Sequence, residues 1–277
     1  MSATPRSPST PDRSERTVTP GPGLRLDRHG SVLRVTFDRP ATLNGLTAES
    51  LNSAAEAVET AGGHSGLRAI VLTGAGRAFS SGADLRGSPN PPPSAGPGTL
   101  EAVNRLVRAV RVVPMPVLAA VNGPAVGGGC SIALAADIVL ARESAYFMLS
   151  FTNIGLMPDG GASVLVPDAV GRARAARMAM LGERIPAPLA ADWGLIAHAV
   201  PDETFDSEVE RLTTRLAQGP TMAYAQTKRA LNAAALDRLE QAFAIEAAGQ
   251  TVLKGTADFT EGVSAFRHKR KPRFLGE

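Results

Sequence analysis

The order of apolar and polar residues near the start of the chain predicts a pair of strands. The stretch Val32–Phe37 alternates apolar and polar side chains from its second residue, which is the period of a strand with one buried face. A second apolar stretch, Leu24–Leu26, precedes it across the turn dipeptide His29-Gly30. We therefore expect a hairpin, which Arg39-Pro40 ends.

Further along the chain, helical and strand-like patterns take turns. Thr47 is a suitable capping residue for the stretch Ala48–Thr60, whose apolar residues recur at helical spacing. Ala69–Leu72 and Val117–Val121 are short continuous apolar runs, typical of strands that are buried on both faces. The other predicted elements are a helix containing Leu100–Val110, a helix over Ser131–Ala136, strands at Ile138–Ala141 and Ala145–Met148, and a helix beginning near Gly161.

From Pro186 onward every periodic stretch is helical, at about 187–193, 203–217, 221–234 and 236–253. This order predicts an α/β core over residues 23–200 and a helical C-terminal region over residues 201–277. Residues 1–22 are rich in Ser, Thr, Pro and Arg and almost lack large apolar side chains, so we expect a disordered tail. This tail has no apolar segment of the kind found in secretory signals.

Composition places the chain among ordinary globular proteins. Its 277 residues are 44% hydrophobic and 20% charged, and no apolar run reaches the ~18 residues of a membrane-spanning helix. The single cysteine excludes an internal disulfide and the usual zinc clusters, and it favours a reducing cytoplasm. Although the net charge is only +3, basic residues crowd the C-terminus, which suits nucleic acid, an acidic ligand or a solvated tail: Arg267, Lys269, Arg270, Lys271 and Arg273.

The stretch from Val121 to Gly161 carries the clearest chemical signal. A buried strand ends in a loop, and an Ala-rich helix begins at three consecutive glycines, Gly127–Gly129. Such a run costs backbone entropy, which is explained if another molecule must approach the backbone closely. The first N–H groups of a helix lack internal partners and favour a negatively charged oxygen. We therefore expect an oxyanion hole here, with Asp159 as the neighbouring acid or base.

Other kinds of site lack their motifs. There is no G-x-x-x-x-G-K-[ST], no G-x-G-x-x-G that opens a helix after a strand, and no G-x-S-x-G elbow. The four histidines do not have metal-ligand spacing. Cys130 has no histidine placed to activate it, so we interpret it as a small buried residue. The sequence therefore predicts neither a metal nor a redox cofactor.

Two segments, Gly74–Leu85 and Val121–Ala136, together resemble the crotonase family, also called the enoyl-CoA hydratase/isomerase family. The resemblance implies an α/β fold, a ClpP-like spiral of β-β-α repeats with a helical C-terminal trimerisation region. It also implies an acyl-CoA thioester as substrate and a homotrimer or dimer of trimers, with neither a membrane nor nucleic acid as partner. It extends from about residue 24 to the C-terminus and includes Arg39-Pro40, Leu43-Asn44, Asn122-Gly123, Gly155–Gly161 and Glu261–Phe266.

The resemblance also implies roles for individual residues. Two backbone N–H groups hold the thioester oxygen in this family, and here they would belong to Ser81 and Gly128. One such donor is typically worth a rate factor of ~10²–10³. Backbone groups just after Ser81 would contact the adenine of CoA, and residues near the chain end would contact CoA of the same or a neighbouring subunit. The expected substrate contacts are Ala83, Asp84, Leu85, Leu43, Gly127, Phe151, Phe266 and Lys269.

The chain departs from the hydratase pattern at both catalytic acids. The two glutamate positions hold Ser131 and Phe151, which leaves Asp159 as the nearby carboxylate. This arrangement resembles the branch of ring-1,2-epoxyphenylacetyl-CoA isomerases and 3-enoyl-CoA to 2-enoyl-CoA isomerases. There one base moves a proton between two carbons while the oxyanion hole holds the enolate. Burial among apolar side chains such as Phe151 and Met157 is expected to raise the pKa of Asp159.

Other interpretations stay open. Pro158-Asp159-Gly160 also fits a turn or a helix cap that has no chemical role. The other candidate functions are an enoyl-CoA hydratase in which Asp159 handles both water and proton, a thioester hydrolase, and a non-catalytic homologue that binds acyl-CoA or RNA. The sequence does not specify the acyl group. We expect the loop at 86–98 and the helix after it to contribute to the pocket wall.

Overall fold

A seven-stranded sheet forms the centre of the protein. The computed structural model describes residues 18–64, 66–85, 98–236 and 238–277. The strands of the large sheet, in spatial order, are β1 (Val18–Gly21), β2 (Leu24–His29), β3 (Val32–Phe37), β4 (Ala69–Gly74), β5 (Val117–Val121), β7 (Ile138–Arg142) and β10 (His198–Val200). The predicted hairpin is confirmed, since β2 and β3 pair antiparallel. From β3 to β10 every pairing is parallel.

A second, three-stranded sheet arises because the chain repeats one unit. Strands β5 and β7 lie in the large sheet, and the strands that follow them, β6 (Ala125–Val126) and β8 (Tyr146–Met148), pair in the small sheet with β9 (Ile185–Pro186). After β6 comes helix α3 (Gly128–Leu134), and after β8 comes the 3₁₀ helix η2 (Ser150–Ile154). The chain therefore advances as a spiral of strand, strand and helix.

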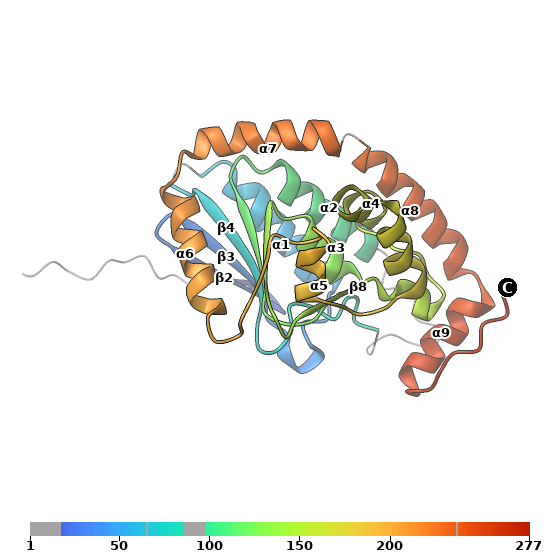
Figure 1. The fold of residues 1–277 in the computed structure, drawn as a ribbon. Coiled ribbons are helices and arrows are strands. Elements are labelled where there is room, and N and C mark those ends of the chain that lie inside the picture. Colours follow the sequence, from blue (N-terminus) through green and yellow to red (C-terminus); the bar gives the residue numbers. More distant parts are fainter. Residues whose placement is uncertain (1–17, 65, 86–97, 237) are drawn as a thin grey trace, which may run out of the picture.

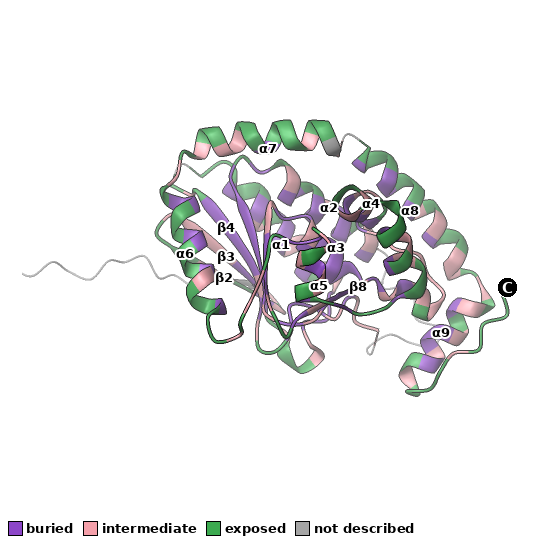
Figure 2. Ribbon diagram, viewed as in Figure 1, coloured by how far each residue is buried: buried purple, intermediate pink, exposed green. Residues whose placement is uncertain are grey.

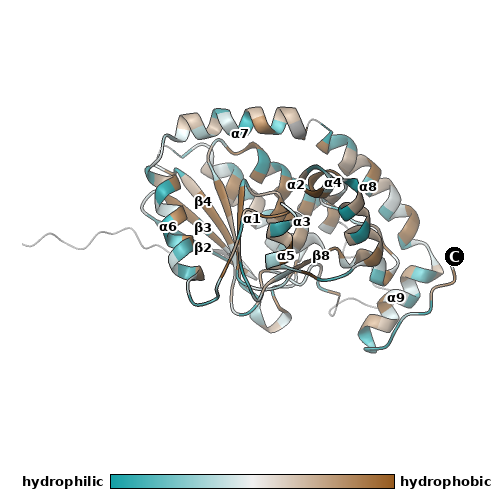
Figure 3. Ribbon diagram, viewed as in Figure 1, coloured by the Kyte–Doolittle hydropathy of each residue, from teal (hydrophilic) through white to brown (hydrophobic). Residues whose placement is uncertain are grey.

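Helices cover both faces of the large sheet, as Figure 1 shows. Inward-facing residues of β4 and β5 pack with α1 (Ala48–Ala61), α2 (Thr99–Val112) and α3 in the main core. Residues that point the other way, such as Val71 and Leu118, pack against α6 (Phe205–Gln218). The strands are accordingly buried and apolar, whereas the helices are polar on their outer sides (Figures 2 and 3). This double burial explains the continuous apolar runs in the sequence.

The remaining helices form a chain of elements around the core. They are α4 (Ala162–Leu181), α5 (Ala187–Asp192), α7 (Thr221–Ala235), α8 (Leu239–Lys254) and α9 (Ala257–Arg267), with the 3₁₀ helix η1 at Pro40–Thr42. Figure 1 shows α7 running along one side of the molecule and α8 and α9 continuing to the C-terminus. Within the described residues, no helix combines the length and the apolar character that crossing a membrane requires.

The structure corrects several sequence-based expectations. The prediction of disorder for residues 1–22 is wrong at its end, because Val18–Gly21 forms β1 and pairs with β2; the earlier part, and most of the 86–98 loop, lie outside the described residues. Strands β6, β9 and β10 were not predicted: β6 and β9 have two residues each, too few to show a period, and the three residues of β10 begin with the polar His198. Helix α3 begins at Gly128, within the glycine run that was expected to start it, and therefore three residues before the predicted bound at Ser131. Helix α9 was not predicted, because the last stretch identified by its helical period ends at about residue 253.

One buried ion pair attaches α7 to the core. The ammonium group of Lys228, with only 6% of its side chain exposed, donates to Val110 O at 2.6 Å and Met115 O at 3.2 Å and pairs with Asp137 Oδ2 at 2.8 Å. Asp137 Oδ2 also accepts the N–H of Val117 at 2.8 Å. Burial lowers the pKa of Lys228, and the charge of Asp137 opposes this effect. Removal of either residue would leave the other charge without its ion-pair partner.

We expect Lys228→Met to lower the free energy of unfolding by about 3–5 kcal/mol, because Asp137, with 19% of its side chain exposed, would stay largely shielded from water without its counter-charge. Urea denaturation followed by circular dichroism measures this change. Arg229→Met, on the exposed neighbouring residue, serves as the control and is expected to change stability by less than ~0.5 kcal/mol. Equal losses in the two variants would contradict the anchoring role of Lys228.

Candidate active site

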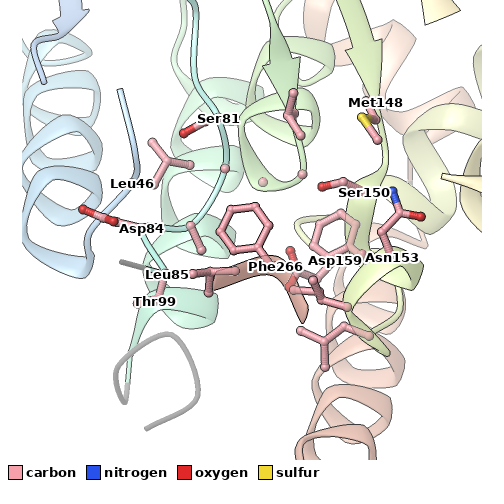
Figure 4. A pocket seen from close by; sticks show the side chains of 18 of the residues that line it. Leu46, Ser81, Asp84, Leu85, Thr99, Met148, Ser150, Asn153, Asp159 and Phe266 are labelled. Carbon is pink, nitrogen blue, oxygen red and sulfur yellow. The ribbon is translucent and has the colours of Figure 1, made fainter. Parts of the chain in front are cut away.

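A pocket of about 520 Å³ opens where the loop at 80–85, the start of α3, η2 and the C-terminal helices meet. In Figure 4, Leu46, Ser81 and Asp84 lie along one wall, and Met148, Ser150 and Asn153 lie along the opposite wall. Most lining residues are apolar. Asp84 and Asp159 supply the carboxylates of the wall, and none of the four histidines belongs to it, in the part of the chain that the structure describes.

Backbone pairing brings the two glycine-containing loops side by side. Ser80 forms a parallel bridge with Ala125, and the N–H of Val126 donates to Ser80 O at 2.9 Å. Gly82 adopts a φ of +83°, and a Cβ atom there would lie 2.9 Å from Val126 O. Only glycine allows both this conformation and this close contact. The loops at 80–83 and 126–128 therefore form one continuous wall of the pocket.

The predicted role of Ser81 as a backbone donor is wrong. Its N–H already donates to Leu43 O at 2.9 Å, and its hydroxyl donates to Thr42 O at 3.0 Å. By contrast, the N–H groups of Ala83 and Gly128 have no acceptor among the described residues, and both residues line the pocket. The N–H of Asp84 donates to Leu46 O, and neighbouring N–H groups of extended backbone point to opposite sides. The available pair of donors is thus Ala83 and Gly128.

Asp159 lies on the other side of the pocket and is held from two directions. The hydroxyl of Ser131 in α3 donates to the backbone oxygen of Asp159 at 2.7 Å. The side-chain amide of Gln250 in α8 donates to Asp159 Oδ2 at 2.8 Å. Gly160 and Gly161 follow with φ values of +69° and +80°, so the chain turns sharply into α4. This turn leaves the carboxylate half-buried at the edge of the pocket.

The surroundings of Asp159 favour its neutral form. The pKa of Asp159 is raised to about 7, mainly by burial and also by the nearby carboxylate of Glu246, although the Gln250 hydrogen bond and the charge of Lys254 act in the opposite direction. The other carboxylate of the wall, Asp84, accepts a hydrogen bond from Arg39 at 2.7 Å in an ion pair. A carboxyl group that titrates near neutral pH is suited to taking up and returning a proton.

Comparison with known proteins identifies the family of this chain. A family model described as enoyl-CoA hydratase/isomerase matches residues 27–277. The chain belongs to the enoyl-CoA hydratase/isomerase family. Its fold is the crotonase fold, as the resemblance implied. A crystal structure of an enoyl-CoA hydratase from Mycobacterium avium subsp. paratuberculosis K-10 superimposes with a TM-score of 0.86 at 47% identity, covering 91% of this chain and 98% of the other.

Two curated relatives carry different activities in their names. The chain is 45% identical over 263 residues to a probable enoyl-CoA hydratase of Rhodobacter capsulatus, and the alignment covers 91% of this chain and 98% of the relative. It is 38% identical over 250 residues to 1,2-epoxyphenylacetyl-CoA isomerase of Escherichia coli K12, and this alignment covers 89% of this chain and 95% of the relative. The relatives of this chain thus include one named for adding water and one named for an isomerisation.

Ser131 and Phe151, which the resemblance places at the two glutamate positions of hydratases, make structural contacts in this protein. Ser131 is fully buried and holds the backbone of Asp159, as described above. Phe151 is also buried and contributes its ring to the pocket wall. Neither side chain titrates in the range of a carboxyl group. Asp159 is therefore the one carboxyl of the wall that is not ion-paired within the described residues.

The pocket brings together most of the residues proposed from the sequence. Lys269 is exposed and does not line the pocket, and the adjacent Arg270, paired with Glu261, lines it instead. Cys130 is buried, and burial raises the pKa of its thiol to about 12, as fits a small core residue. The proposed residues that line the pocket are Leu43, Ser81, Ala83, Asp84, Leu85, Gly127, Gly128, Phe151, Asp159 and Phe266.

Sequence reasoning missed the contribution of α8. Gln250 and Lys254 line the pocket, and Glu246 lies one turn earlier on the same helix. Their spacing of four residues places them on one helix face, which is a signal that the sequence contains. Polar residues on an otherwise apolar face would have marked this helix as part of a site.

We expect Asp159→Asn to raise the melting temperature at pH 8 more than at pH 5. The pKa of Asp159 is raised in the folded state, so its ionisation costs stability as the pH rises through about 7. An asparagine stays neutral and avoids this cost. Differential scanning calorimetry at the two pH values, with the exposed Asp192→Asn as control, measures the difference. An equal gain at both pH values would contradict this account of Asp159.

Proposed function

We propose that this enzyme shifts a carbon–carbon double bond of an enoyl-CoA thioester through an enolate. The observation that carries the proposal is that Asp159, a carboxyl group without an ion-pair partner, shares the pocket with the N–H groups of Ala83 and Gly128, which have no acceptor among the described residues. A double-bond shift needs one group that removes a proton and returns it elsewhere, together with a site for the negative charge that develops in between.

The steps follow from this arrangement. Ionised Asp159 removes a proton from the carbon beside the thioester carbonyl, and the electron pair moves onto the carbonyl oxygen. The N–H groups of Ala83 and Gly128 donate to that oxygen and stabilise its charge. Protonated Asp159 then returns the proton two carbons along the chain, and the double bond moves into conjugation with the carbonyl. No water or second acid takes part, which suits a pocket with Ser131 and Phe151 at the glutamate positions.

Hydration is the second candidate, because the relative from Rhodobacter capsulatus is named a probable enoyl-CoA hydratase. It would require Asp159 both to activate a water molecule and to deliver the proton. A panel of saturated, 2-enoyl and 3-enoyl CoA thioesters distinguishes the candidates. Isomerisation of a 3-enoyl thioester creates the absorbance of a conjugated thioester, hydration of crotonyl-CoA removes it, and hydrolysis releases a free thiol.

We further propose a homotrimer, or a dimer of trimers, in the cytoplasm. Helices α7 and α8 carry apolar side chains that are more than half exposed in the single chain. Contact with other copies would remove these side chains from water. They are Met222, Leu231, Ile245 and Val252.

We expect Asp159→Asn to abolish isomerisation, with a fall in kcat of at least ~10³-fold, while binding of a saturated acyl-CoA is retained. In the parent enzyme, kcat/KM should rise with pH through about 7 and then level off, because the base must be ionised. Stopped-flow absorbance and isothermal titration calorimetry measure the two quantities. Turnover of 3-enoyl-CoA by the variant at the parent rate would refute the role of Asp159.

Gly128→Ala tests the oxyanion hole with little disturbance of the fold. Its Cβ would lie 3.5 Å from Val103 Cγ2 and 3.6 Å from Leu46 Cδ1, which are ordinary contacts, but it would stand beside the donor N–H. We expect a melting temperature close to that of the parent and a fall in kcat/KM of about 10²-fold. The matched variant Gly129→Ala places a Cβ 2.6 Å from Ser80 Cβ and should instead lower the melting temperature. Full activity of Gly128→Ala would contradict the assignment.

A further inference from the structure

One face of α8 packs against the segment that carries Asp159. Glu246 and Gln250 lie one helical turn apart on this face, with 0% and 1% of their surface exposed. Gly249 lies beside them, and a Cβ there would overlap Met157 Sδ at 2.2 Å, so the helix backbone itself is in contact with this segment. Buried polar groups require partners, and the carboxylate of Glu246 and the amide nitrogen of Gln250 find theirs between residues 157 and 163.

Gln250 contacts the carboxyl group of Asp159 directly. Its Nε2 donates to Met157 O at 2.8 Å and to Asp159 Oδ2 at 2.8 Å. A backbone carbonyl oxygen only accepts, so the Met157 contact fixes which end of the Gln250 amide faces the carboxyl. No donor in the described part of the chain contacts Asp159 Oδ1. One carboxyl oxygen is thus tied to α8, and the other is left for the pocket.

Glu246 holds the turn that follows. Its Oε2 accepts the N–H of Gly161 at 2.8 Å, and its Oε1 accepts the N–H and the hydroxyl of Ser163 at 3.0 Å and 2.6 Å. These donors belong to the first turn of α4, whose N–H groups have no partner within the helix. The loop between Met157 and α4 is therefore fastened to α8 at both ends.

We propose that Gln250 is a positioning residue for the reaction: it holds Asp159 Oδ2 against α8 so that Oδ1 faces the acyl chain. Glu246 supports the same arrangement by fixing the turn after Asp159. This inference rests on the proposed function, because it gives Asp159 the role of the base. It adds that the geometry of this base is set by α8.

The charges around Asp159 determine how loss of Gln250 would change its titration. Glu246 and Lys254 face it from α8, and the wall of the pocket adds Arg270 and Asp84, the latter paired with Arg39. Donation from Gln250 favours the charged carboxylate and lowers its pKa, against the dominant effect of burial. Removing this donor leaves burial and Glu246 in place, so the pKa of Asp159 should rise.

The test is Gln250→Met, which keeps the length of the side chain and removes the donor. We expect kcat for a 3-enoyl-CoA at pH 7 to fall about 10- to 100-fold, KM to stay within about twofold, and the acid limb of the kcat profile to move to higher pH. The exposed Gln241→Met on the same helix is the matched control and should behave as the parent. An unchanged rate and pH profile in Gln250→Met would overturn the proposal.

A second variant separates positioning from simple support of the fold. Gln250→Glu places a carboxyl group next to Asp159, so its acid limb should move further than that of Gln250→Met. Equal loss of rate and of saturated acyl-CoA affinity in both variants, with lowered melting temperatures and unmoved pH profiles, would instead show a structural role and overturn the proposal. If Asp159→Asn stays active, the proposed function fails; if it is inactive while Gln250→Met matches the parent, only the positioning role fails.

Discussion

The backbone pairing between Ser80 and Ala125 is the contact on which the site depends. It joins the loop after β4 to the loop after β5, and it places Ala83 and Gly128 on one wall of the pocket. The hydroxyl of Ser80 strengthens the junction, since it donates to Asn44 O at 2.9 Å and accepts the N–H of Gly82 at 3.1 Å. All of these groups are buried or partly buried, so each needs the partner it has. A wall made of main chain is stiff, and it presents N–H groups whatever the side chains are.

The large elements of the fold follow from the sequence because each has a clear period. Val32–Phe37 alternates, Ala69–Leu72 and Val117–Val121 are wholly apolar, and Ala48–Thr60 has helical spacing. The small sheet escapes such reasoning, because β6 and β9 contain two residues each. Strands β6 and β8 come directly after β5 and β7, whose pairing in the large sheet brings β6 and β8 side by side. Tertiary structure, and not local sequence, therefore determines that the small sheet forms.

The site was partly predictable for a similar reason. Gly128 and Asp159 stand in segments with strong local signals, a glycine run at a helix start and a Pro-Asp-Gly turn. Ser81 was predicted as the second donor, because the identity of a residue does not reveal the direction in which its backbone N–H group points. That direction depends on the positive φ of Gly82 and on the contacts with Leu43 and Leu46. The partners of Asp159 on α8 lie far away in the sequence, and packing alone brings them near.

The attachment of Asp159 to α8 also has a consequence for the order in which the enzyme is completed. A chain made from its N-terminus can form the large sheet, the glycine loop and α4 before residues 239–254 emerge. At that stage the loops that carry Ala83 and Gly128 can already pair, but the turn that carries Asp159 lacks its contacts with Gln250 and Glu246. The carboxyl group of Asp159 is therefore held in its observed position only after α8 has docked, and the pocket wall closes in the same step, because Gln250 and Lys254 belong to it.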